Sequence, residues 1–375
     1  MPLGPLVDLL DLDGVDELLN SGIRRKGRVR MLRDGAAVDP AEFTWGEGAH
    51  RAPDEVRPSA VGRLLRAGAT LALNDLQKAW TPLRELCGSL AHELGITVDA
   101  AAFLTPAGKA GFDYHHDGMP VMIAQTVGSK TWRLQPPVVA DPLPHEIAVA
   151  DEDLERIKKT PPVFQATLYP GDVLWIPTGW MHSGVATDEP SLHVSFVFRT
   201  VTRYWIATEV VSYLEQCLTG DDALRGELPW TGAKNRETLA AIVAEIVEEV
   251  ADYLTRLDSA AVVGQVRERL RARANEAVRT PAGSLRASTV GVDTAVALAA
   301  SSIHGVDLRD DGGLIIEMRD SRVAVGAPAA AFIASRWAEG MAEPWCARDL
   351  APALGEQQAV DLVRRLLRSD ALSLA

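Results

Sequence analysis

Two histidines and an aspartate stand side by side in the stretch "GFDYHHDGMPVMIAQTVGSKTW" (111–132). If residues 112–118 are extended, successive side chains point to opposite faces, so His115 and Asp117 share one face and His116 lies on the other. An imidazole and a carboxylate placed in this way can bind one metal ion. An H-x-D triplet is common, however, and roughly half an occurrence is expected by chance in such a chain, so a third ligand is needed.

The best candidate for the third ligand is His182, in "LYPGDVLWIPTGWMHSG" (168–184). Turns at 170–172 and 177–179 bound an apolar strand, which could carry His182 back across a β structure to the other two side chains. Two histidines and one carboxylate on one face of an octahedral ion leave three positions open. Non-haem Fe(II) oxygenases have this arrangement.

The open positions suit a bidentate 2-oxo acid together with O₂, and the far carboxylate of such a co-substrate needs a cation. Lys130 fits this role, because Gly128 and Ser129 can form a two-residue hairpin turn that places Lys130 at the start of a strand paired with 121–127. From there the ammonium could enter the barrel as a point charge. The alternative is a solvated lysine at a strand end, since lysines are mostly exposed.

Short β-type runs separated by Gly, Pro and Asp turns fill residues 98–200 and predict an all-β sandwich or barrel that positions these side chains. The runs are "AAFLTP", "PVMIAQTV", "KTWRLQ", "QATLYP", "DVLWIP" and "SLHVSFVF". Before them, apolar residues at helical spacing predict a helix over 75–94, capped by Asn74 or Asp75 and kinked or restarted at Pro82.

Beyond residue 200 the pattern becomes helical. Amphipathic helices are predicted over 203–218, 236–257 and 260–278, and such helices must pack on each other or on a second subunit. A linker is expected over 279–289. The last part of the chain combines a hairpin, "LIIEMRDSRVAVG" (314–326), with helices that supply a small core, a pattern compatible with a winged-helix unit.

Composition predicts a fully folded chain of two or three domains, since 375 residues with 47% hydrophobic and 24% charged residues are typical of globular proteins. The net charge of −13 argues against a surface that coats nucleic acid and favours a basic protein or peptide partner. The three cysteines lie far apart, so we expect neither disulfides nor a thiolate zinc site, and a reducing cytoplasm is the expected location. No signal peptide pattern and no run of roughly 18 apolar residues is present, so no membrane association is expected.

With these residues in place, the chain resembles the JmjC-type branch of the cupin superfamily, in particular the ribosomal oxygenases of bacteria and humans. The stretches that carry the resemblance are "LTPAGKAGFDYHHD", "AQTVGSKTWRL", "YPGDVLWIPTGWMHSG" and "SLHVSF". The Fe(II) ligands that the resemblance implies, and hence the catalytic residues, are His115, Asp117 and His182. It also implies that Lys130 holds the distal carboxylate of 2-oxoglutarate, and we expect Gln125 and Ser195 beside this co-substrate.

The resemblance implies an α+β fold. A double-stranded β-helix (cupin/JmjC) barrel with N-terminal helices would occupy residues 1–200, a helical dimerisation region 201–280 and a C-terminal winged-helix-like domain 281–375. The implied reaction is oxidative decarboxylation of 2-oxoglutarate by Fe(II) and O₂, coupled to hydroxylation of an amino-acid side chain in a ribosomal or similar protein. The enzyme would be a homodimer.

Departures from the family pattern concern the substrate end of the site. Ribosomal oxygenases tend to have a tyrosine and an asparagine where this chain has Phe103 and Ala101, and Gly118 replaces their usual acid. These changes remove hydrogen-bonding groups, so a peptide natural product or a small amino-acid-derived molecule is an alternative substrate. The residues expected on the substrate side are Tyr114, His116, Phe103, Ala101 and His193, although His193 could equally be a core histidine bonded to a neighbour.

A function outside catalysis is also open, because a winged helix on a metal-binding barrel could form a sensor or a DNA-binding regulator. The helical segment "AVDLVRRLLRSDALSL" (359–374) has only three arginines, and the basic stripe expected of a groove reader is missing from this sequence. Nucleic acid is therefore not an expected partner.

Overall fold

The computed structural model describes residues 6–23, 27–33, 35–46, 52, 54–222, 224–228, 235–273, 285–299, 302–318, 321–338 and 343–375. The chain divides into two compact units, one made of 1–200 with 275–375 and the other of 201–274. Among the described helices, none is both long enough and apolar enough to cross a membrane.

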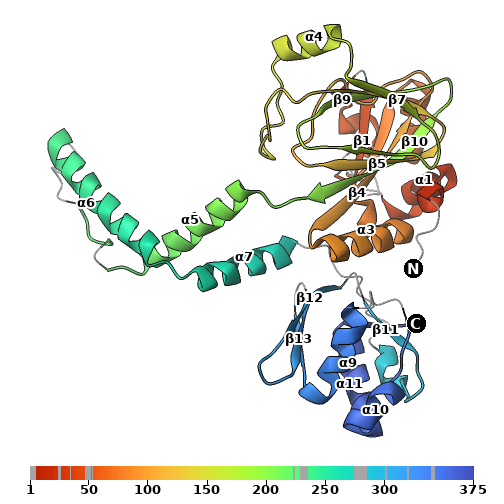
Figure 1. Ribbon diagram of the computed structural model, residues 1–375. Coiled ribbons are helices and arrows are strands. Elements are labelled where there is room, and N and C mark those ends of the chain that lie inside the picture. The colour runs from red at the N-terminus through yellow and green to blue at the C-terminus, as the bar shows by residue number, and fades with distance from the viewer. Residues whose placement is uncertain are drawn as a thin grey trace. The chain divides into compact units, whose positions relative to one another are not determined.

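Two antiparallel sheets form the centre of the barrel (Figure 1). One sheet has the strand order β2-β1-β3-β4-β10-β5-β8 and the other β7-β6-β9. The strands are β1 Val29–Arg33, β2 Ala36–Ala37, β3 Thr70–Leu73, β4 Thr97–Thr105, β5 Val121–Val127, β6 Lys130–Gln135, β7 Phe164–Leu168, β8 Val173–Ile176, β9 Met181–Ala186 and β10 Ser191–Arg199. Buried apolar residues of both sheets pack together between them, among them Ile123 from β5 and Leu134 from β6. The all-β core predicted for residues 98–200 is therefore confirmed.

The outer face of the larger sheet is covered by the N-terminal helices, whose apolar side chains join those of β1, β3, β4 and β10 in one core. These helices are α1 Leu12–Glu17, α2 Pro58–Arg66 and α3 Thr81–Leu94, with the short turns η1 Leu6–Leu9, η2 Leu18–Gly22, η3 Pro40–Glu42 and η4 Leu76–Lys78. The predicted restart at Pro82 is confirmed, because α3 begins at Thr81 with proline in its first turn. The predicted cap is wrong: Asp75 precedes η4 with φ 57°, and Trp80 is the N-cap of α3. Proline lacks an N–H and has a helical φ, which favours a helix start here.

The turn at Gly128 and Ser129 connects the two sheets rather than two paired strands. β5 pairs with β10 and β8, whereas β6 pairs with β7 and β9, so the predicted pairing of Lys130's strand with 121–127 is wrong. Gly128 has φ +60°, and a Cβ there would lie 2.0 Å from the carbonyl oxygen of Pro190. Only glycine fits this crossing, which lets β6 begin inside the barrel.

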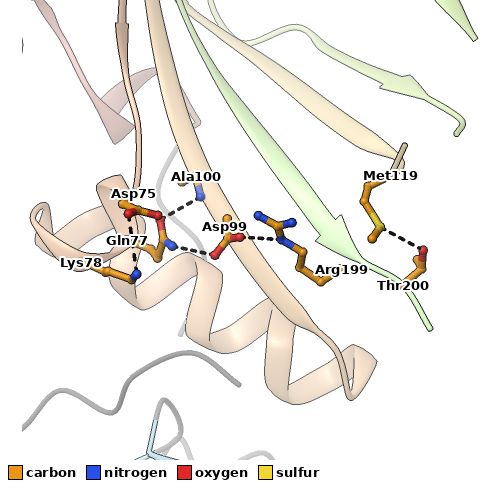
Figure 2. A network of polar contacts seen from close by, with 8 residues as sticks. All are labelled: Asp75, Gln77, Lys78, Asp99, Ala100, Met119, Arg199 and Thr200. Carbon is orange, nitrogen blue, oxygen red and sulfur yellow. Dashed lines mark hydrogen bonds and ion pairs between the residues drawn. The ribbon is translucent and has the colours of Figure 1, made fainter. Parts of the chain in front are cut away.

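A polar network fixes the point at which β10 leaves the sheet (Figure 2). The carboxylate of Asp99 on β4 accepts hydrogen bonds from Gln77 Nε2 and from Arg199 Nε, both at 2.7 Å. One residue further on, the hydroxyl of Thr200 donates to the sulfur of Met119 at 3.7 Å. Met119 follows the H-x-D stretch, so the same strand end contacts the loop that carries two of the predicted ligands.

The second unit consists of helices, as predicted: α5 Arg203–Thr219, α6 Arg236–Thr255 and α7 Ser259–Arg273. The expected extension of the last helix over 274–278 and most of the predicted linker, 279–284, lie outside the described residues. No residue of α6 is buried. The exposed large apolar side chains of α6 are Leu239, Val243, Ile246, Val247 and Leu254.

The C-terminal part of the chain has its own apolar core, and the predicted hairpin is confirmed as β13 paired with β14. Its elements are η5 Ala287–Thr289, β11 Val296–Leu298, β12 Ile303–Leu308, β13 Leu314–Met318, β14 Arg322–Val325, α9 Ala327–Ala338, α10 Ala347–Leu354, α11 Glu356–Arg368 and β15 Leu372–Leu374. The apolar side chains of α11 form one buried face, which accounts for the helical spacing seen in the sequence.

Candidate metal centre

The side chains of His115, Asp117 and His182 converge on one point. One ligand atom from each lies within 4.8 Å of the other two, and His182 Nε2 is 3.6 Å from Asp117 Oδ2. The two imidazole rings have their centroids 4.3 Å apart. Among the described residues no other group of histidine, cysteine and acidic side chains meets the same criterion. The structure thus brings together the three ligands that the sequence predicted.

The three side chains converge although the segment that carries His115 and Asp117 is not the extended strand considered from the sequence. Residues 112–118 form a loop rather than a strand, and only His115 makes a β-bridge, with His182 at the start of β9. Each residue donates its backbone N–H to the carbonyl of the other, at 3.1 and 2.8 Å. Gly179 N donates to the carbonyl of Asp117 at 3.0 Å. The extended conformation on which the alternation argument was conditional is therefore not present, because these bonds with a distant segment replace a continuous ladder.

Both histidines have the tautomer that a metal site requires. His115 Nδ1 lies 2.9 Å from the carbonyl oxygen of Asp113, and His182 Nδ1 lies 2.9 Å from that of Trp180. A carbonyl only accepts, so each Nδ1 carries the proton and donates, which leaves the Nε2 lone pair available. Burial first, and then neighbouring His115, lowers the pKa of His182 to about 4. This ring is therefore neutral at neutral pH, as a metal ligand must be.

A buried cation lies inside the barrel. Lys130, at the start of β6, is 3% exposed, and its Nζ donates to the hydroxyl of Thr105 at 3.2 Å. An ammonium has three N–H donors, but in the described part of the chain Lys130 makes only this hydrogen bond. No carboxylate in the described residues forms an ion pair with Lys130. Burial lowers the pKa of Lys130 to about 7. The solvated alternative for Lys130 is excluded, and the ammonium is left able to bind an anion.

Six aromatic rings form a closed chain of contacts that includes the two histidine ligands, with centroid distances from 4.3 to 6.1 Å. In order they belong to Phe112, His115, His182, Trp132, His193 and Phe103. His193 stacks on Phe103 at 5.1 Å and meets the edge of Trp132 at 5.2 Å. His193 Nδ1 is buried with no hydrogen-bond partner in the described residues. The expected alternative, a core histidine bonded to a neighbour, is therefore not what the structure has.

The other residues expected near the co-substrate lie on paired strands. In the register of β10 with β4, His193 is opposite Phe103 and Ser195 is opposite Ala101. Gln125, on the other side of β10, is opposite His193. Its amide nitrogen donates to Ser191 Oγ and to nearby carbonyls, while its Oε1 is buried and has no partner among the described atoms.

His116 and Tyr114 lie on the same loop as the ligands. His116 is 5% exposed, is not part of the convergent group, and its Nδ1 has no partner in the described structure. Tyr114 is half-buried. Sequence reasoning missed Thr105, which bonds Lys130. Its position two residues beyond Phe103, on the same face of β4, is the signal that could have revealed it.

Comparison with known proteins relates one segment of this chain to the JmjC domain. The family model of the JmjC domain matches residues 77–205, which contain both sheets' central strands and all three convergent ligands. The resemblance inferred from the sequence is thereby confirmed over this segment.

Particular relatives agree with this class. A bifunctional lysine-specific demethylase and histidyl-hydroxylase, NO66, from Dictyostelium discoideum is 34% identical over 140 residues, covering 37% of this chain and 27% of the relative. Ribosomal oxygenase 2 from Mus musculus is 30% identical over 196 residues, covering 50% of this chain and 40% of the relative. This chain thus matches well under half of the length of either relative.

Solved structures show the same fold over nearly the whole chain. The structure of YcfD from Escherichia coli gives a TM-score of 0.57 at 15% identity, covering 98% of this chain and 91% of that chain. YcfD, a ribosomal oxygenase, has also been solved with cobalt and 2-oxoglutarate, with a TM-score of 0.51 at 15% identity and the same coverage. The predicted mixed fold with a JmjC/cupin barrel is confirmed by these comparisons.

Proposed function

We propose that this protein is an Fe(II)- and 2-oxoglutarate-dependent dioxygenase that hydroxylates an amino-acid side chain of a protein. The observation that carries the proposal is the convergence of His115, Asp117 and His182, with their ligand atoms within 4.8 Å of one another. Support comes from the JmjC family model and from relatives described as hydroxylases or ribosomal oxygenases.

The residues present fit the metal. Two neutral imidazole nitrogens and one carboxylate oxygen are the donor set that non-haem Fe(II) oxygenases use, and three protein ligands leave room for a co-substrate. The carbonyls of Asp113 and Trp180 fix both rings with Nε2 available. Cobalt in the E. coli neighbour supports a divalent ion at this kind of site.

The residues also fit 2-oxoglutarate. Lys130 supplies a buried positive charge for the distal carboxylate, and Thr105 holds the ammonium in place. His193 Nδ1 is buried and has no hydrogen-bond partner in the described residues, and burial, together with the charge of nearby Lys130, lowers the pKa of His193. We assign Lys130, Gln125 and Ser195 to co-substrate binding and His193 to the boundary between co-substrate and substrate.

When bound, iron, O₂ and 2-oxoglutarate supply the oxidation, which yields succinate and CO₂ and converts a substrate C–H into C–OH. The chain's own residues bind and orient these reactants. The centroid of the Trp132 ring lies 5.2 Å from Lys130 Nζ, and Phe103 stacks on His193, so the buried Lys130 can act beside apolar surface that shields it from water.

The substrate we propose is a basic protein segment, such as part of a ribosomal protein, and the name ribosomal oxygenase given to similar proteins supports this proposal. The net charge of −13 favours capture of such a partner. Phe103 and Ala101 present no hydrogen-bonding side-chain group to the substrate, and this favours, as a second candidate, an enzyme that tailors a peptide natural product. Tyr114 and His116 are proposed to lie on the substrate side.

The substrate experiment compares wild type with His182→Ala. Each protein is incubated with cell extract, Fe(II), 2-oxoglutarate and O₂, and ribosomal proteins are searched by mass spectrometry for the gain of one oxygen atom. Wild type alone should produce the gain. Absence of any modified protein, together with metal-dependent 2-oxoglutarate turnover, would favour the peptide-tailoring candidate. Absence of turnover in both proteins would favour a regulator.

The assignment of the remaining parts is also a proposal. We infer a barrel domain of residues 1–200, a helical dimerisation region of 201–280 and a winged-helix-like domain of 281–375. The exposed apolar face of α6 supports a homodimer. Free cysteines support a cytoplasmic location.

DNA binding has little support from the C-terminal helix α11. Arg364 donates to the carbonyl of Val290, and Arg365 donates to that of Ala324. Side chains used in this way hold the domain together and are poorly placed to bind phosphates.

A further inference from the structure

The connection between β6 and β7, residues 136–163, contains the helix α4, Asp151–Lys159, which lies outside the two sheets (Figure 1). Gln135 closes its base, because Nε2 donates to the carbonyls of Thr160 and Pro161 at 2.8 and 2.9 Å. We call residues 136–163 the α4 segment. It contacts the ligand loop, residues 113–118, near both of that loop's ends.

At the first end, an ion pair joins α4 to the loop. Lys158 Nζ lies 2.7 Å from Asp113 Oδ2, while the other carboxylate oxygen of Asp113 accepts the backbone N–H of Tyr114 at 2.8 Å. The carbonyl of the same Asp113 accepts the Nδ1–H of His115. Lys158 is thus connected to His115 through Asp113: Lys158 binds the carboxylate of Asp113, and the carbonyl of Asp113 orients the imidazole of His115.

At the second end, the α4 segment packs directly against the loop backbone. A Cβ on Gly118 would lie 2.6 Å from the Cα of Pro144, so the two backbones are in close contact next to Asp117. A Cβ on Gly179, which bonds the carbonyl of Asp117, would lie 2.6 Å from Cδ of Pro142. The α4 segment therefore supports the two ligands of the loop from both sides.

This support matters because the loop lacks a strand ladder. In the described structure, the backbone hydrogen bonds of the loop to β9 and to the turn before β9 involve His115 and Asp117. The two ends of the loop depend on side-chain and packing contacts. A loop held in this way can shift by more than a strand residue can, and a metal site tolerates little displacement of its ligands.

We propose that Lys158 is a positioning residue: through Asp113 it fixes the imidazole of His115, and so it couples the α4 segment to the metal centre. The inference rests on the proposed metal site. Lys158 need not touch metal, co-substrate or substrate. Its influence should appear as a change in metal affinity and in the electronic spectrum of the bound metal.

The experiment uses Co(II) alone as the probe, titrated into the full-length protein and followed by visible absorption. Exposed ion pairs have small effects, so Lys158→Ala should weaken Co(II) by about threefold. Lys158→Glu places a like charge against Asp113 and should weaken it by about tenfold, with a changed spectrum. Lys158→Arg should restore affinity to within about twofold of wild type.

The matched control is Lys159→Glu. Lys159 is the next residue of α4, its side chain is 78% exposed, and its ion pair is with Glu155 at 3.8 Å. This variant makes the same charge change and should bind Co(II) as wild type does. Equal affinity and equal spectra for Lys158→Glu and Lys159→Glu would overturn the inference. If wild type itself fails to bind Co(II), the proposed metal site is wrong, a result distinct from failure of Lys158 alone.

Discussion

Lys130 has two opposing effects, on co-substrate binding and on folding, and replacing it by methionine should separate them. Methionine keeps much of the side-chain volume but removes the ammonium that the proposed function assigns to the distal carboxylate of 2-oxoglutarate. Leaving a buried charge without its partner costs about 3–5 kcal/mol. The dissociation constant of 2-oxoglutarate should therefore rise between roughly a hundredfold and a few thousandfold in Lys130→Met.

The effect on folding should have the opposite sign. Burial lowers the pKa of Lys130 to about 7, against roughly 10.4 for a lysine in an unfolded chain. Between these values the unfolded chain binds more protons than the folded one, so this lysine's contribution to the free energy of unfolding rises with pH. At pH 7 the buried lysine costs on the order of 4 kcal/mol. Lys130→Met should therefore raise the melting temperature of the metal-free protein at pH 7, and the gain should shrink towards pH 10.

The assay is calorimetric titration of 2-oxoglutarate into protein saturated with Co(II), together with thermal unfolding of the metal-free protein at pH 7 and pH 9.5. Lys109→Met removes a lysine that is exposed and should change neither result. Wild-type affinity for 2-oxoglutarate in Lys130→Met would refute the assignment of the co-substrate cation. A lower melting temperature at pH 7 would refute the burial argument.

Substitutions at three further positions test the co-substrate site and the barrel. His193→Phe keeps a ring in the stack but removes the polar ring nitrogens, and calorimetry should show 2-oxoglutarate binding about tenfold weaker, with His193→Asn closer to wild type. Gly184→Ala adds a Cβ that would lie 2.8 Å from Cε of Lys130, so 2-oxoglutarate should bind at least about fivefold more weakly while Co(II) affinity stays unchanged. Gly128→Ala places a Cβ against Pro190 at φ +60° and should lower the free energy of unfolding by about 2–3 kcal/mol in urea titrations. Unchanged 2-oxoglutarate affinity in His193→Phe or Gly184→Ala, or an unchanged free energy of unfolding in Gly128→Ala, would contradict the corresponding contact.

Much of the site could be predicted because its chemistry depends on residue types at fixed spacing. His115 and Asp117 are two residues apart, and His182 follows a turn-bounded apolar strand, so the sequence alone could predict that these three side chains converge. The extended conformation considered for 112–118 is not present, because the backbone bonds that shape this loop come from Gly179 and His182, far along the chain. Local alternation carries no information about such a partner.

The connection between β5 and β6 is a second feature that the sequence alone could not predict. Gly128 and Ser129 indicate a turn, but the same residues serve a hairpin or a crossing, and only the contact with Pro190 distinguishes the two. The ion pair of Lys158 with Asp113 was likewise invisible, because it joins segments 45 residues apart whose approach depends on the path of the α4 segment. Position alone could not decide whether Lys130 was exposed, and burial inside the barrel settles the question.

The most direct test of the central claim is a titration of Co(II), followed by 2-oxoglutarate, monitored by visible absorption in wild type and in His182→Ala. Wild type should bind one equivalent of Co(II) per chain, and 2-oxoglutarate should then change the spectrum of the bound ion, because it enters the open coordination positions. His182→Ala should lose at least about a hundredfold in Co(II) affinity and show no response to 2-oxoglutarate. The same Co(II) affinity and spectrum in both proteins would contradict a metal centre formed by these three side chains.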